Sequence, residues 1–207
     1  MEDFEDLLDE PEPIEAYCVS CKEKVEMEEP VAVWTSKGQA ATRGFCSVCG
    51  NNVFRMGRTY LHSGIHAPKA IQVIPAGAKG RAARAAYIAA AVTDAEFVQH
   101  LAEDIRSMGI NVWIDDGTQE VDLTQWAGGV HPALEQCTHL IVVLSGFTEN
   151  TGSVQAAWEY FLKQRKPVAI VKIEDVEPPD PLRSRRRFDF VQDYKTAFRG
   201  LVDMLSG

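Results

Sequence analysis

Long apolar runs are missing from this sequence, and no stretch approaches the length of a membrane-spanning helix. The first residues are acidic, where a secretory signal peptide needs a basic start followed by an apolar run. These two absences predict a cytoplasmic protein that makes no membrane contact. In that reducing compartment, closely spaced cysteines are better interpreted as metal ligands than as disulfides.

An excess of positive charge is also missing. The chain has 21 lysines and arginines against 30 aspartates and glutamates, which gives a formal net charge of −9. Because phosphate binding needs clustered cations, nucleic acid is a possible partner but not the favoured one. Residues 1–16 contain no base at all, and with Pro11 and Pro13 among them they predict an acidic tail outside the folded domains. The 45% of apolar residues in 207 allow one ordinary domain and a small one.

Four of the five cysteines form two pairs with the same spacing, Cys18-x-x-Cys21 and Cys46-x-x-Cys49. Two such pairs can bring four thiolates to one tetrahedral zinc ion. The sequence between them predicts a β-hairpin that turns at Gly38. All four ligand positions are filled, so the ion is expected to be structural and to fold residues 17–56 as a zinc ribbon. Four unrelated thiols, or a redox pair without its usual βαβ context, are the alternatives.

The segments around both cysteine pairs, residues 17–21 and 44–50, resemble a small zinc-ribbon family of microbial proteins, some of them fused to topoisomerase-like chains. The resemblance implies binding to nucleic acid or to protein. Acids interleave with the cations of this region, which favours a protein contact. Residues 57–84 are rich in alanine, glycine and cations and predict a linker, in which His62 and His66 are interpreted as surface residues.

Residues 85–206 alternate apolar runs with amphipathic segments. The runs at residues 85–92, 111–114, 140–144 and 167–171 are typical of buried strands, and the segments between them predict helices. Thr93 and Glu96 fit a capping box at the start of the first helix. This alternation implies a parallel sheet with helices on both faces. Cys137, between a helix and a buried run, is interpreted as a core thiol.

The same region resembles a TIR domain, most specifically in residues 109–115, where Gly-Ile-Asn-Val-Trp-Ile-Asp is similar to the second strand of that family. Residues 86–94 are similar to its first strand and following acid, residues 140–145 to its third strand and serine, and residues 166–171 to its fourth strand. The resemblance implies a flavodoxin-like fold with five parallel strands. It also implies signalling through association with itself or another TIR-like protein and, for many members, NAD cleavage.

NAD-cleaving TIR domains use a glutamate on the helix after the third strand, and this chain departs from that pattern. The family spacing lands on Ala157 whether it is counted forward from Ser145 or backward from Lys166. Glu159 lies two residues further on, and about 200° of helical rotation should point it away. The first strand also ends in Ala89-Ala90-Ala91-Val92, which offers no hydrogen-bonding side chain.

Two functions are therefore favoured over a third, a nucleic-acid-binding regulator led by the ribbon, which the net charge opposes. The first is an interaction protein that assembles through its TIR-like domain and carries a zinc ribbon. The second is an NAD glycohydrolase of microbial defence that uses Glu159 or another acid. The acidic loop at residues 115–122 and the basic run Arg183–Arg187 are interpreted as solvated segments that are able to contact a partner.

Overall fold

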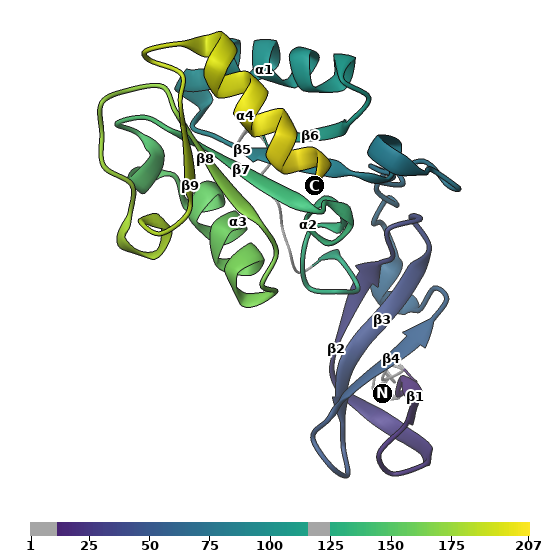
Figure 1. Cartoon of the computed structure of the whole chain (residues 1–207). Helices are drawn as coiled ribbons and strands as arrows, with labels where there is room; N and C mark the ends of the chain where they lie inside the picture. The colour runs from purple at the N-terminus through teal and green to yellow at the C-terminus, as the bar shows by residue number, and fades with distance from the viewer. Residues whose placement is uncertain (1–11, 116–124) are drawn as a thin grey trace, which may run out of the picture. The chain divides into compact units, whose positions relative to one another are not determined.

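The computed structural model describes residues 12–115 and 125–207 (Figure 1). The chain forms two compact units. The first contains Met1–Ala70 and Leu123–Gly129, and the second contains Ile71–Asp122 and Val130–Gly207. Most of the predicted acidic tail and nearly all of the predicted acidic loop lie outside the described residues. None of the helices in the described ranges combines the length and the apolar character that crossing a bilayer requires.

The first unit contains a four-stranded antiparallel sheet in the order β1-β2-β3-β4. Its strands are β1 (Glu15–Cys18), β2 (Glu23–Trp34), β3 (Ala40–Cys46) and β4 (Asn52–Met56). The predicted hairpin is confirmed by the pairing of β2 with β3, and Gly38 takes a φ of 73° in its turn, a conformation that a glycine adopts without strain.

The core of this unit is small. Alternate residues of the strands face inward, so that a few apolar side chains cluster beneath the cysteines: Ile14, Ala16, Val25, Met27 and Val53. Cys18 and Cys46 belong to the same buried cluster. A core of this size supplies little hydrophobic stabilisation, so a cross-link through the cysteines would add much to the stability of the unit.

The second unit contains the predicted five-stranded parallel sheet, and its strands lie in the order β6-β5-β7-β8-β9 (Figure 1). Its strands are β5 (Ala85–Ala89), β6 (Asn111–Asp115), β7 (His139–Leu144), β8 (Val168–Lys172) and β9 (Arg186–Asp189). Every residue of β5 and β7 is buried, which explains why these strands read as continuous apolar runs.

Helices cover both faces of this sheet (Figure 1). They are α1 (Ala95–Ser107), α2 (Pro132–Gln136), α3 (Gly152–Lys163) and α4 (Tyr194–Ser206), with short 3₁₀ turns η1 (Tyr60–His62), η2 (Gly80–Ala83), η3 (Val92–Asp94), η5 (Thr148–Asn150) and η6 (Asp180–Leu182). Tyr87 of β5 packs in the core beneath α2 and α3, whereas Ile88 packs beneath α1 and α4. The alternation of the strand thus supplies two separate cores.

Two local expectations are wrong. His62 is buried at 1% exposure, edge-on to Trp34, and its ring contacts Thr59, so it is not a surface residue. The capping box at residue 93 does not form, because Asp94 occupies the N-cap position and its carboxylate is bound elsewhere. A tertiary partner overrides the local signal in both cases.

Candidate functional sites: a four-cysteine centre and the carboxyl edge of the parallel sheet

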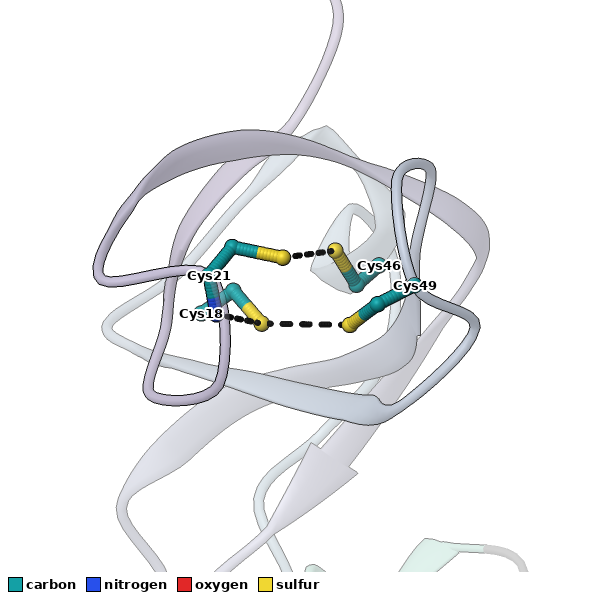
Figure 2. Close-up of side chains that lie close together, drawn as sticks. All are labelled: Cys18, Cys21, Cys46 and Cys49. Carbon is teal, nitrogen blue, oxygen red and sulfur yellow. Dashed lines mark hydrogen bonds between the residues drawn. The ribbon is translucent and has the colours of Figure 1, made fainter.

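Two turns of the first unit present the cysteines to one another (Figure 2). In the first turn the N–H of Lys22 donates to the carbonyl of Cys18 at 2.8 Å, and in the second the N–H of Gly50 donates to that of Cys46 at 2.9 Å. Lys22 and Gly50 take positive φ angles of 61° and 69°. The two turns therefore have the same geometry, and Gly50 takes the left-handed conformation of its turn without strain.

The four sulfur atoms lie within 4.8 Å of one another, so these cysteines could bind a metal ion. The Sγ atoms of Cys18 and Cys49 are 3.6 Å apart, and those of Cys21 and Cys46 are 3.8 Å apart. Tetrahedral coordination with Zn–S bonds of about 2.3 Å places ligand sulfurs at about 3.8 Å, so the arrangement fits a zinc ion. All five cysteines of the chain are free thiols, with no disulfide between them.

The electrostatics of the cluster favour a bound cation. The backbone N–H of Cys21 lowers the pKa of the Cys18 thiol to about 7, which favours the thiolate that a metal ligand must be. The pKa of the Cys21 thiol is raised, chiefly by its hydrogen bond with Cys49. Without a metal, four neighbouring thiols cannot all ionise, because like charges at this distance repel one another.

The carboxyl ends of β5 and β7 form a second candidate site. In the sheet, β6 lies on one side of β5 and β7 lies on the other, so the strand order reverses between β5 and β7. Open α/β sheets bind their ligands at such a point. Ser145, directly after β7, donates its hydroxyl to the carboxylate of Asp94 at 2.7 Å, and both side chains are buried. A pocket of about 430 Å³ opens beside Asp94 and is lined by Thr93, Glu96, Phe97, His100, Ile173 and Tyr194.

The two residues named for NAD cleavage lie on different sides of α3. Ala157 is 1% exposed and packs in the core that includes Tyr87. Glu159 is exposed, and its carboxylate accepts a hydrogen bond from the side chain of Gln155 at 2.8 Å. The side chain of Glu159 therefore leaves the helix on its solvent face, away from the sheet.

The structure also describes the lone cysteine, the basic run and the first residue of the acidic loop. Cys137 is buried at 1% exposure, and burial raises its pKa to about 12, as expected of a core thiol. Within the basic run, Arg183 pairs with Asp180 at 2.9 Å and Arg187 with Glu177 at 3.5 Å. At the end of β6, Asp115 is buried and accepts a hydrogen bond from the hydroxyl of Tyr87 at 3.1 Å.

Sequence reasoning missed the pairing of Asp94 with Ser145. Both residues follow buried strands, and the carboxyl ends of parallel strands meet at one edge of a sheet, so their adjacency was open to inference. It also missed the buried His62, because a histidine in a segment without periodicity gives no sign of the partner that covers it.

Two parts of the chain match known families. Residues 17–56 match a family described as a domain of unknown function (DUF5679), and residues 87–202 match the TIR domain family. Among solved structures, the TIR domain of the Toll-related receptor TRR-2 from Hydra magnipapillata is similar, with 17% identity and a TM-score of 0.48 over 59% of this chain and 98% of that one. A search of curated proteins found no significant match.

The match to the TIR family covers more than half of the chain, and the five-stranded parallel sheet with helices on both faces is the one that the sequence predicts. This chain belongs to the TIR domain family.

Proposed function

We propose that this chain is a cytoplasmic signalling protein that acts by association of its TIR domain with a second copy or with another TIR domain, while a zinc ion holds its N-terminal ribbon folded. The sequence predicts a tail at 1–16, a ribbon at 17–56, a linker at 57–84 and a TIR domain at 85–206, and the end of the predicted tail, Ile14 to Ala16, packs with the ribbon. The observation that carries the proposal is the burial of Ala157 on the face of α3 where NAD-cleaving relatives are expected to present a glutamate.

An association surface is available at the carboxyl edge of the parallel sheet. Val92, Phe147 and Val191 are each more than half exposed, and they follow β5, β7 and β9 respectively. In the described part of the second unit, the only other large apolar side chain that is exposed is Met108, at the far end of α1. Exposed apolar residues gathered at one edge are typical of a protein contact.

NAD cleavage is the second candidate function, and the buried Asp94 at the strand-order reversal is the observation that favours it. A carboxylate there, or Glu159, would have to stabilise the cationic sugar that forms as nicotinamide leaves. Glu159 would need the helix to turn, since its side chain leaves α3 on the solvent face.

The purified, zinc-loaded protein is expected to release no nicotinamide from NAD above a protein-free control, even at protein concentrations at which TIR domains assemble. The reason is the lack of a carboxylate at position 157. Chromatography of the reaction mixture measures the release, with Glu159→Ala and Asp94→Asn variants in parallel. Release by the native chain that either variant abolishes would identify the acid and make the protein an NAD glycohydrolase.

The average mass of the protein is expected to rise with concentration, because the apolar carboxyl edge associates. Multi-angle light scattering over a dilution series measures it. A Phe147→Asp variant should shift the rise to at least tenfold higher concentration, since a charge at a buried contact opposes association by more than about 1.4 kcal/mol. The matched control is Met108→Asp, which lies away from that edge. Equal association of both variants would contradict the assigned surface.

A further inference from the structure

The cations of this chain are concentrated in one segment. No aspartate or glutamate occurs between Glu29 and Asp94, whereas the same segment contains eight cations: Lys37, Arg43, Arg55, Arg58, Lys69, Lys79, Arg81 and Arg84. The net charge of −9 therefore conceals a basic stretch that includes all of β3 and β4. The acids of the ribbon lie before it, on β1 and β2 and in their flanks.

The same two strands expose aromatic side chains. Phe45 on β3 is 40% exposed and Phe54 on β4 is 41% exposed. In the antiparallel ladder Phe45 pairs with Asn52 and Arg43 pairs with Phe54, so the two rings lie diagonally on one face of the sheet. Two neighbouring phenylalanines that are exposed to water do not stabilise the ribbon. Such a pair is typical of a surface that a partner covers.

A groove of about 270 Å³ opens between β1 and β4, beside Phe54. Two aromatic rings line it, those of Tyr17 and Phe54, together with the cations Lys24 and Arg55 and the acid Glu15. Tyr17 is 57% exposed, so its ring is accessible. Aromatic rings beside positive charges fit a ligand that has a planar ring system and an anionic group. A nucleotide has both, in its base and its phosphate.

Within the described residues, the cations of this face form no ion pair, and the half-buried Arg43 has its guanidinium close to Gly129. Across the described residues, the ion pairs all lie between positions 172 and 187, and none includes Lys24, Arg43 or Arg55. The arginines of the TIR domain differ, because Arg183 and Arg187 have acidic neighbours that neutralise them. The ribbon is thus the place where unneutralised cations and exposed rings coincide.

We propose that the ribbon binds single-stranded nucleic acid across β3, β4 and the groove beside β1. One base stacks against Phe54 and Tyr17 in the groove, the next stacks on Phe45, and Arg55, Arg43 and Lys24 bind the phosphates. A single strand is the ligand because stacking on side chains requires bases that are not already paired in a duplex. The inference does not depend on the association surface proposed above. Binding of nucleic acid at the ribbon would be the signal to which the TIR domain responds.

The full-length, zinc-loaded protein is expected to bind a fluorescein-labelled oligothymidylate of about 15 nucleotides saturably, a length suited to single-strand sites. Fluorescence anisotropy measures the affinity, with an RNA of matching sequence and a duplex in parallel. Phe54→Ala should weaken binding about 5- to 150-fold, the range for loss of one base–aromatic stack. Arg55→Gln should reduce the slope of affinity against salt by about 0.7, one phosphate contact.

A third variant should change the affinity in the opposite direction. Glu15→Gln should strengthen binding, because it removes the one carboxylate that lines the groove. The controls are Met108→Ala and Arg185→Gln in the TIR domain, which should bind as the native chain does. Zinc content and circular dichroism show that each variant is folded.

Three results would overturn the proposal: no saturable binding, binding of the duplex as tight as that of the single strand, or native affinity in folded Phe54→Ala. In the first case the exposed rings are left for a protein partner. None of these results bears on the association of the TIR domain, which is measured without nucleic acid.

Discussion

Replacement of Cys46 by serine is expected to release the metal and unfold the ribbon while the TIR domain stays folded. A structural zinc ion supplies about 10–16 kcal/mol of apparent binding free energy in small zinc domains, and here that free energy is folding free energy. The apolar core beneath the cysteines contains only a few side chains and includes Cys46 itself. It is too small to keep the four strands together alone.

Metal analysis of the purified protein measures the first part, with about one zinc per native chain and none in the variant. Hydrogen exchange measures the second, and fast exchange is expected in β2 and β3 of the variant with unchanged protection in β7. Cys137→Ser is the matched control, since Cys137 is buried in the other unit and lies outside the cluster. Full protection of β2 in a zinc-free Cys46→Ser protein would show that the ribbon folds without its ion.

The cysteine cluster was predictable because short stretches of sequence determine it. The spacing within each pair fixes a turn, the turn fixes the direction of two thiols, and the hairpin between the pairs brings them together. That the cluster binds zinc stays a prediction, which rests on the chemistry of four thiolates.

The sheet of the TIR domain was predictable for a related reason. Strands buried on both faces must be apolar throughout, so β7 and β8 are visible as runs in the sequence. Features that depend on distant partners were not visible. Thr93 was expected at the N-cap of α1, but Asp94 occupies that position. The carboxylate of Asp94 accepts a hydrogen bond from Ser145, which lies 51 residues away.

The two surfaces were beyond prediction for the same reason. Val92, Phe147 and Val191 look like scattered apolar residues in the sequence, and only the parallel order of the strands collects them at one edge. The ribbon groove needs Tyr17 and Phe54, which are far apart in the chain, to come together from β1 and β4, the two edge strands of the sheet. Net charge gives no sign of the basic segment, because the acids outside residues 30–93 outweigh its eight cations.

Substitution of Ala157 by glutamate is expected to destabilise the TIR domain by about 3–5 kcal/mol, the usual effect of an uncompensated buried charge. The methyl group of Ala157 packs in the core that contains Tyr87, Trp158 and Phe161, so a carboxylate there meets apolar groups and no water. Glu159→Ala is the matched control on the same helix. It should change the stability by less than about 0.5 kcal/mol, since it alters only an exposed side chain.

Urea unfolding measures the difference, with hydrogen exchange in β7 to assign it to the TIR domain rather than the ribbon. Ala157→Gln separates size from charge: it should destabilise less than the glutamate at neutral pH, and the two variants should converge as falling pH protonates the carboxyl group. A folded, fully stable Ala157→Glu protein that releases nicotinamide from NAD would mean that position 157 borders an open site. The native alanine would then be the single change that separates this chain from an NAD-cleaving one. Loss of stability without activity would mean instead that the core has closed over the position, and that association is what this TIR domain retains.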